Sequence, residues 1–493
     1  MIYLNKNIIK KIMIFTEILL FVCMISVFNV VTTRGKTYME KAVNQRKTSD
    51  VVKNIRGKIY DRNMISFVEQ GTDIIKTPGG ELSIPGRYDS TTLLRHIIGS
   101  VRSDGRGTGG LEEMYDDILS DEGEIYVNSF NDGSGNPIYD MSKKGFEIKK
   151  TKDKSLSLSI DWHIQKIAEE ELDKSGLKGS VCIMDSMSFS PLALASRGNF
   201  DQNDIEKYLD SPEGELIDRS TSSYDAGSIF KIITVAAALE NNIADTDFTV
   251  ECNGSVNIDG TEFPCHNKEG HGKVDMKDAF AKSCNVYFYK LGNMTGIKNI
   301  YIMAKKFSLG QKILHLPWEN KGNSQILENI HPNEIANISI GQGNILITPI
   351  QAVNMVNIVA NNGIMKKSHL VNGVINTRGV LEDDFREYRE ERVISDDVSY
   401  KIKEMMRSVM LYGTGRDYNI TDTDICGKTG TAETGWVEDD DTMTHGWFVG
   451  FFPMDKPVYS IAVFLENGKS GYNAGKLFQN ITKEIIRCGY LKK

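Results

Sequence analysis

The chain has 493 residues, of which 40% are hydrophobic and 25% charged, as in globular proteins that bury a substantial core. This length suits two or three domains and excludes a single small domain. The formal net charge of −8 argues against a nucleic-acid-binding surface, because phosphate contacts require clustered Lys and Arg.

The N-terminal region carries an apolar run, IMIFTEILLFVCMISVFNVV (12–31), with a single charged residue, Glu17. The run is about as long as a helix must be to cross a bilayer core, and no small-residue cleavage site follows it. We therefore predict an uncleaved transmembrane signal anchor over 12–33. Lysines flank the run on both sides, so charge alone does not set its orientation. Glu17 is expected either to reach the membrane interface or to contact another membrane protein.

The next region, 34–150, is rich in Gly, Asp, Ser and short strand-like runs. We predict a smaller β-rich N-terminal domain here, which ends near the polar stretch KKTKDK (149–154). From residue 151 the pattern changes to alternating strands and an amphipathic helix with Asp161 as its N-cap. These early elements are a strand at 155–160, the helix at 161–174, and strands at 179–186 and 191–196 that pair as a hairpin.

Two further strands and a final helix close the chain. They are expected at 446–453, 458–467 and 473–487. Because helical segments lie between the early and the late strands, we predict an antiparallel sheet covered by helices, a mixed α+β fold, for 151–493.

A serine and a lysine stand at the head of an otherwise apolar helix in the stretch YDAGSIFKIITVAAALE (224–240). Ser228 and Lys231 are three residues apart, so on a helix they share one face. A serine hydroxyl is a poor nucleophile at neutral pH and needs an adjacent base. Lys231 can be that base if burial lowers its pKa and keeps it neutral.

The Ser-x-x-Lys spacing alone indicates little, because the chain repeats it at Ser175 and Lys178. Two distant segments give the first copy its context. Ser283 lies in DAFAKSCNVYFYKLG, a second apolar helical stretch, and Lys428 lies in DICGKTGTAE, just before a predicted strand. Three such elements in this order, each in a suitable structural setting, are hard to obtain by chance.

The order Ser-x-x-Lys, Ser-x-Asn, Lys-Thr-Gly resembles the signature of penicillin-binding proteins and serine β-lactamases. The surrounding sequence looks like the transpeptidase domain of class B, monofunctional penicillin-binding proteins through most of 152–493. ISIGQGNILITPIQ (338–351) is similar to the Gly-Gln-Gly segment of that family. RGKIYDRN (56–63) and LRHIIGSV (94–101) resemble parts of its N-terminal pedestal domain. Ala226 stands where the family usually has proline, a departure that does not touch the chemistry.

The resemblance and the chemistry together suggest roles for the motif residues. Ser228 is expected to be acylated, with Lys231 as its base. Ser283 would relay a proton from Lys231 to the leaving amine, and Asn285 would bond the peptide amide of the substrate. Lys428 would supply positive charge near the substrate carboxylate. The substrate-binding residues expected beside it are Thr429, Gly430 and Thr431. The backbone N–H groups of Ser228 and Thr431 would form the oxyanion hole.

The activity that the resemblance implies is D,D-transpeptidation. The enzyme would acylate on the D-Ala-D-Ala end of peptidoglycan stem peptides and cross-link them, and β-lactams would acylate and inhibit it. Serine acyl chemistry requires no cofactor. The alternatives are a β-lactamase or D,D-carboxypeptidase, and a non-catalytic scaffold for cell-wall synthesis. A second, glycosyltransferase domain of about two hundred residues would not fit in 34–150.

The location follows from the substrate. Stem peptides lie outside the membrane, so 34–493 is expected to be extracytoplasmic and 1–11 cytoplasmic in a single-pass protein of the cell membrane. The resemblance also implies a membrane-embedded glycosyltransferase partner, bound through the anchor and the pedestal.

Two cysteines and two histidines gather before the Ser-x-Asn motif. Cys252, Cys265, His266 and His271 lie within twenty residues and could bind zinc tetrahedrally. Alternative ligands in the same region are Cys284, Asp259 and Asp275. A Cys252–Cys265 disulfide and a pair of reduced thiols are the other interpretations. Any zinc here would be structural.

Overall fold

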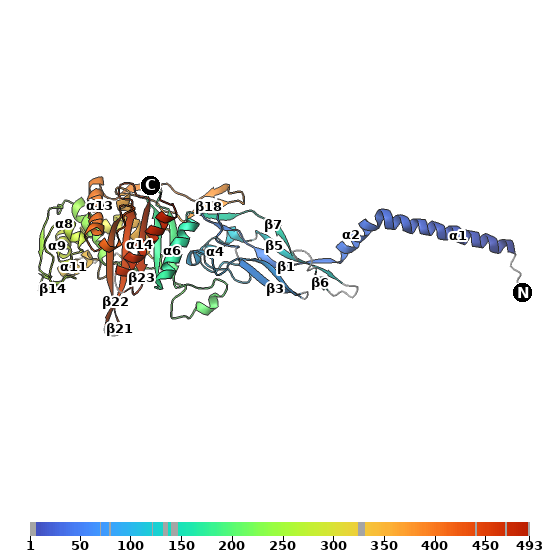
Figure 1. Ribbon diagram of the computed structural model, residues 1–493, viewed down its shortest axis with the longest axis horizontal. Helices are drawn as coiled ribbons and strands as arrows, with labels where there is room; N and C mark the ends of the chain where they lie inside the picture. The colour runs from blue at the N-terminus through green and yellow to red at the C-terminus, as the bar shows by residue number, and fades with distance from the viewer. Residues whose placement is uncertain are drawn as a thin grey trace. The chain divides into compact units, whose positions relative to one another are not determined.

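Figure 1 shows the chain as a computed structural model. It describes residues 6–69, 71–77, 80–120, 122–131, 137–139, 146–323, 331–438, 441–468 and 471–491. The contacts divide the chain into two compact units. The first comprises Met1–Ile55, Thr72–Pro85 and Asp121–Lys152, and the second comprises Arg56–Gly71, Gly86–Ser120 and Asp153–Lys493. Two segments of the predicted N-terminal domain, 56–71 and 86–120, thus pack within the second unit.

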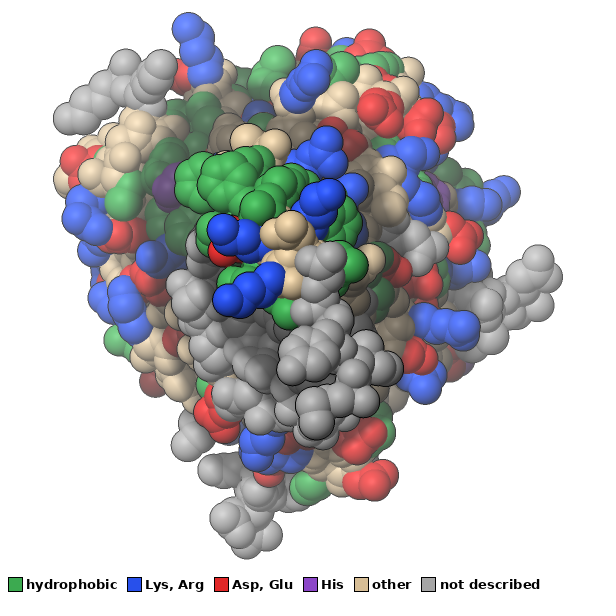
Figure 2. Space-filling view, turned by 90° about the vertical axis from the view of Figure 1, so that its right-hand side faces the viewer, with side chains coloured by type: hydrophobic (Ala, Val, Ile, Leu, Met, Phe, Trp, Pro, Cys, Tyr) green, Lys and Arg blue, Asp and Glu red, His purple; other side chains and the backbone are tan. Residues whose placement is uncertain are grey.

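The first unit begins with a long exposed helix. Its parts are α1 (Lys6–Asn29), a π-helical turn η1 (Val30–Arg34) and α2 (Gly35–Arg46). By length and composition, Lys6–Ala42 could cross a membrane. Figure 2 looks at this end of the chain and shows hydrophobic side chains together with Lys and Arg side chains. The predicted anchor, 12–33, lies inside this helix and is compatible with it.

The rest of the first unit is antiparallel sheet. In a four-stranded sheet, β5 pairs with the other three strands. The strands are β1 (Lys47–Ile55), β5 (Gly123–Asn131), β6 (Pro137–Tyr139) and β7 (Phe146–Lys150). A separate pair is formed by β3 (Gly71–Thr77) and β4 (Gly80–Gly86). The β-rich character predicted for this part of the sequence is therefore confirmed.

The second unit is built on a five-stranded antiparallel sheet in the order β10-β9-β23-β22-β21. Its strands are β9 (Gly179–Asp185), β10 (Pro191–Arg197), β21 (Cys426–Glu438), β22 (Asp441–Phe452) and β23 (Tyr459–Leu465). The predicted hairpin is present, because Ala195 pairs with Val181. All seven residues of β23 are buried, as their apolar sequence requires of a central strand.

The predicted covering of the sheet by helices is confirmed, and helices lie on both of its faces. α6 (Trp162–Ser175) and α14 (Gly471–Arg487) pack on the face that carries Val181 and Val463. The predicted cap of α6 is confirmed, since the Asp161 carboxylate accepts from the backbone of His163 and Ile164. α12 (Pro349–Ala360) and α13 (Asp396–Leu411) cover the opposite face.

A second group of helices contacts α13 and carries two of the motif residues, Lys231 and Asn285. It comprises α7 (Lys231–Glu240), α8 (Met276–Ala281), α9 (Asn285–Thr295), α10 (Ile297–Lys306) and α11 (Pro332–Ser339). α7 is buried almost completely and contacts α9, α10 and α13. Lys231, the first residue of α7, is therefore supported by core packing.

Short strands and turns complete the second unit. The two-stranded sheets pair β11 (Tyr224–Asp225) with β16 (Leu346–Ile347), β12 (Val250–Cys252) with β15 (Gly272–Val274), β13 (Ser255–Ile258) with β14 (Thr261–Pro264), and β17 (Ile364–Lys366) with β20 (Glu390–Arg392). A four-stranded sheet has the order β19 (Leu381–Asp384), β18 (Val371–Ile375), β8 (Ser155–Leu158) and β2 (Ile59–Tyr60). The short helices are α3 (Arg95–Ile98), α4 (Gly110–Met114), α5 (Asp116–Leu119), η2 (Ile205–Tyr208), η3 (Gly227–Phe230) and η4 (Arg416–Tyr418).

Candidate active site

Ser228 lies in the single turn η3, which leads directly into α7. The residue before it, Gly227, has a φ of +56°, and a Cβ there would lie 2.5 Å from the carbonyl oxygen of Thr431. The Gly227 N–H donates to the carbonyl oxygen of Gly341 at 2.8 Å. Only glycine suits this position, and the turn that carries Ser228 is held against β21 and the Gly-Gln-Gly segment.

Lys231 is fully buried one turn further on. Its Nζ donates to the Ser283 carbonyl oxygen at 2.8 Å, to Ser283 Oγ at 3.0 Å and to Asn285 Oδ1 at 2.7 Å. Burial lowers the pKa of Lys231 to about 7, because the interior disfavours the ammonium form. A substantial fraction of Lys231 is therefore the free amine at neutral pH, as a general base requires.

Ser283 lies between α8 and α9. The sequence predicted it inside a helical stretch, but the helix breaks here, and Ser283 has a φ of +54°. Its Oγ lies 3.0 Å from Lys231 Nζ and 3.0 Å from Lys428 Nζ. The break turns the hydroxyl toward both lysines, where it can pass a proton from one side of the site to the other.

Lys428 reaches the same hydroxyl from β21 and also donates to the Thr429 carbonyl oxygen at 3.0 Å. The side chain is fully buried. Burial first, and repulsion from Lys231 second, hold the pKa of Lys428 well below its usual value. The two lysines share one desolvated site, so the charge on one disfavours a charge on the other.

The three residues after Lys428 face different neighbours. Thr429 Oγ1 lies 2.6 Å from Thr414 Oγ1, and Thr414 belongs to none of the three sequence motifs. A Cβ on Gly430 would lie 2.9 Å from the side chain of Ile229, next to Ser228. Thr431 Oγ1 accepts from the Gly471 N–H at 3.2 Å. In the described part of the chain, β21 is the edge strand of its sheet and pairs with β22.

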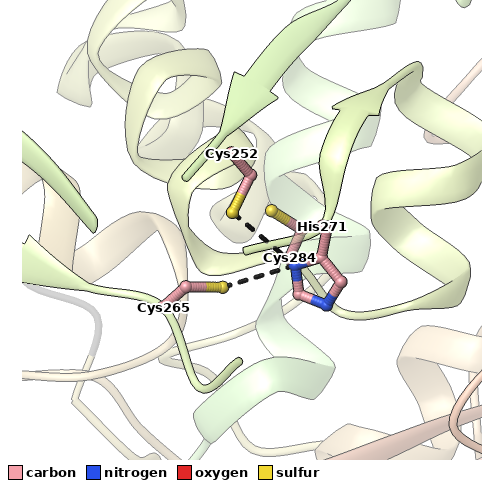
Figure 3. Close-up of side chains that lie close together, drawn as sticks. All are labelled: Cys252, Cys265, His271 and Cys284. Atoms are coloured by element: carbon pink, nitrogen blue, oxygen red, sulfur yellow. Dashed lines mark hydrogen bonds between the residues drawn. The ribbon is translucent and has the colours of Figure 1, made fainter. Parts of the chain in front are cut away.

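The structure brings the predicted cysteine and histidine cluster together, with Cys284 in the place predicted for His266 (Figure 3). Cys252, Cys265, His271 and Cys284 point toward one another, and their ligand atoms all lie within 4.8 Å of each other. His271 Nδ1 lies 3.6 Å from both Cys252 Sγ and Cys265 Sγ. His266 is exposed beside the cluster, with Nδ1 3.9 Å from Cys265 Sγ. Cys284, named from the sequence as an alternative ligand, thus occupies the fourth position.

The thiols of this cluster are not cross-linked. All seven cysteines lie in the described part of the chain, and each is a free thiol. The Cys252–Cys265 disulfide considered from the sequence is therefore not formed in this structure. The pKa of the Cys265 thiol lies well below its usual value, chiefly because the Cys284 thiol hydrogen-bonds to it.

Comparison with known proteins gives a consistent result. The family described as penicillin binding protein transpeptidase domain matches residues 179–487. Peptidoglycan D,D-transpeptidase MrdA of Acinetobacter baumannii is 30% identical over 496 residues, covering 88% of this chain and 70% of the relative. Stage V sporulation protein D of Bacillus subtilis is 31% identical over 427 residues, covering 81% of this chain. The match spans 63% of that relative, which is less than two thirds of its length.

Solved structures share the fold. The D,D-transpeptidase domain from Eggerthella lenta superposes with a TM-score of 0.71 at 23% identity, covering 89% of this chain and all of that domain. Penicillin binding protein 3 from Mycobacterium tuberculosis, complexed with aztreonam, has a TM-score of 0.71 at 23% identity and covers 90% of this chain and 98% of its own.

Proposed function

Since the chain belongs to the penicillin-binding protein transpeptidases, we propose that it is a serine D,D-transpeptidase that cross-links peptidoglycan stem peptides. The observation that supports this most directly is the placement of Ser283 Oγ at 3.0 Å from the Nζ atoms of both Lys231 and Lys428. Ser-x-x-Lys, Ser-x-Asn and Lys-Thr-Gly come from three separate elements and meet at one hydroxyl.

Acylation begins with Ser228. Ser228 Oγ attacks the carbonyl carbon of the penultimate D-Ala, and the hydroxyl proton passes to the neutral amine of Lys231. Ser283 relays a proton from Lys231 to the nitrogen of the departing D-Ala, so the peptide bond breaks as the ester forms. An acceptor amine then attacks the ester by the reverse route. The new amide forms, and the proton of the amine returns to Ser228.

Backbone and side-chain donors around this centre bind the substrate. The N–H groups of Ser228 and Thr431 form the oxyanion hole, an interaction worth about 3–4 kcal/mol for each donor lost. The stem peptide adds to the edge of β21 through main-chain hydrogen bonds. Asn285 contacts the peptide amide of the substrate. Lys428 and the substrate-binding residues Thr429, Gly430 and Thr431 surround its C-terminal carboxylate.

The fate of the acyl-enzyme separates this function from its alternatives. We expect the intact mass of the purified chain to increase by one acyl group on exposure to a stem-peptide analogue. In this analogue a thioester replaces the peptide bond between the last two D-Ala residues. Adding a D-amino acid acceptor should then yield the exchanged peptide. Product that is only hydrolysed would indicate a D,D-carboxypeptidase, rapid turnover of benzylpenicillin would indicate a β-lactamase, and no adduct would indicate a scaffold.

The N-terminal helix suggests how the enzyme reaches its substrate. The exposed apolar helix supports a single-pass anchor over 12–33, with 1–11 cytoplasmic and 34–493 outside the membrane. In this arrangement 34–150 serves as the pedestal and 151–493 as the transpeptidase domain. A membrane-embedded glycosyltransferase is the partner that fits the anchor and the pedestal, and Glu17 is a candidate contact.

A second proposal concerns the cysteine cluster, which suits a structural zinc ion. Three thiols and one imidazole are the ligand types of tetrahedral structural zinc sites, and three of the four side chains are buried. The ligands in this proposal are Cys252, Cys265, His271 and Cys284. Cys284 lies between Ser283 and Asn285, so a bound ion would hold the Ser-x-Asn turn in place. The zinc ion would take no part in the acyl chemistry.

Metal content and thermal stability test the zinc proposal. Protein purified without a histidine tag is expected to contain about one zinc per chain. Cys265→Ser should lose this zinc and lower the melting temperature by about 5–10 °C, because a ligand bound only to the folded state stabilises it. His266→Ala is the matched control and should keep the zinc and the parental melting temperature. Zinc-free parent protein, or equal effects of the two substitutions, would contradict the proposal.

A further inference from the structure

The loop after α13 brings an unassigned threonine to the candidate active site. The N–H of Thr414 donates at 3.0 Å to the carbonyl oxygen of Ala281, the last residue of α8, and its Oγ1 lies 2.6 Å from Thr429 Oγ1. Ala281 stands two residues before Ser283, and Thr429 directly follows Lys428. Thr414 therefore links α8, which ends two residues before Ser283, to the strand that carries Lys428.

The backbone of this loop is well anchored. The N–H of Gly413 donates to the Ser408 carbonyl oxygen at 3.1 Å, and that of Gly415 to the Val409 carbonyl oxygen at 3.0 Å. A Cβ on Gly413 would lie 2.2 Å from the Ala281 carbonyl oxygen, so the close approach depends on glycine. The position of Thr414 is thus set by α13 and α8 together.

The hydroxyls of Thr414 and Thr429 together have one hydrogen that their mutual hydrogen bond does not use. Each threonine hydroxyl carries one hydrogen and accepts through two lone pairs. When the two oxygens share one hydrogen bond, the second hydrogen remains for a ligand, whichever hydroxyl donates to the other. Thr414 is exposed and Thr429 is half-buried, so the pair lies where a bound substrate can reach it. A carboxylate only accepts hydrogen bonds, so it suits the unused hydrogen of this pair. Lys428 lies next to Thr429.

We infer that Thr414 is a positioning residue for the substrate carboxylate. It donates to Thr429 Oγ1 and so directs the Thr429 hydrogen toward the C-terminal carboxylate of the stem peptide, or toward the corresponding carboxylate of a β-lactam. This inference rests on the proposed transpeptidase function. It adds a residue from a fourth element to the three motifs.

Acylation by benzylpenicillin and by its methyl ester tests this role. Thr414→Val keeps the shape of the side chain but removes the hydroxyl. It should slow acylation by the acid about 10- to 100-fold, mainly through weaker binding, because Thr429 is no longer oriented and its hydrogen bond to the charged carboxylate is weakened. Acylation by the ester, which has no carboxylate, should change little. Thr414→Ser should restore the preference for the acid.

Thr377→Val is the matched control, because the Thr377 hydroxyl donates at 2.9 Å to Asp153, outside the site. It should leave both rates unchanged. Equal slowing of acid and ester by Thr414→Val would show that the loop only supports the fold, and unchanged rates would show no role for Thr414. Either result overturns the inference while the parent enzyme is still acylated. A parent chain that reacts with neither compound would instead overturn the proposed function, and this inference with it.

Discussion

Ser228→Ala is expected to abolish acylation by benzylpenicillin and by stem-peptide donors, lowering the rate by about four orders of magnitude or more. Alanine removes the nucleophilic hydroxyl, while the turn η3 stays held by the contacts of Gly227 with Thr431 and Gly341. Intact-mass spectrometry of the parent and the variant after brief exposure to benzylpenicillin measures the effect. The parent should carry a lasting adduct and the variant none.

The chain provides its own control for this substitution. Ser175 begins the second Ser-x-x-Lys spacing, but its Oγ donates to the Leu172 carbonyl oxygen at 2.6 Å at the end of α6. Lys178 in that copy pairs with Glu213 at 2.5 Å. Ser175→Ala should therefore be acylated like the parent. A lasting adduct on Ser228→Ala, with peptide mapping to another residue, would refute the assignment of the nucleophile.

Lys231→Met should slow acylation by about 10²- to 10⁴-fold, the usual contribution of a general base. Methionine fills a similar volume but cannot accept the Ser228 proton. Because the neutral amine is the active form and the pKa of Lys231 is about 7, acylation of the parent should rise with pH and level off above that value. The rate constant for benzylpenicillin acylation, measured across the pH range, should show this inflection in the parent and not in the variant.

Lys178→Met serves as the control for lysine removal, since Lys178 belongs to the exposed pair with Glu213. It should keep the parental rate and pH profile. Circular dichroism of each variant establishes that it is folded. If the parental rate did not depend on pH around 7, or if Lys231→Met retained the inflection, Lys231 would not be the base.

The local features of the fold could be predicted because they depend on neighbours in the sequence. Asp161 caps α6 as expected, since a side chain bonds N–H groups two and three residues further on. The strands of the central sheet were recognised from apolar runs and turn residues, and Ser228 and Lys231 from their spacing at a helix start. Each of these signals is complete within a few residues.

Features that depend on contacts between distant segments could not be predicted. The break at Ser283 arises where α8 and α9 meet, and apolar periodicity continues through it. His266 and Cys284 were both potential ligands by residue type, and only the folded positions of the strands and helices select Cys284. Thr414 has no signal of its own, since a threonine between two glycines resembles any loop.

The sequence by itself therefore determined the class of fold, the three motifs and the chemistry that they support, because these depend on residue type and short-range spacing. Only the tertiary structure decided how those residues meet. It placed Ser283 between the two lysines, joined 56–71 and 86–120 to the second unit, and brought Thr414 to Thr429. The physical reason is that each of these contacts joins segments whose separation along the chain carries no local signal, so that packing alone sets their geometry.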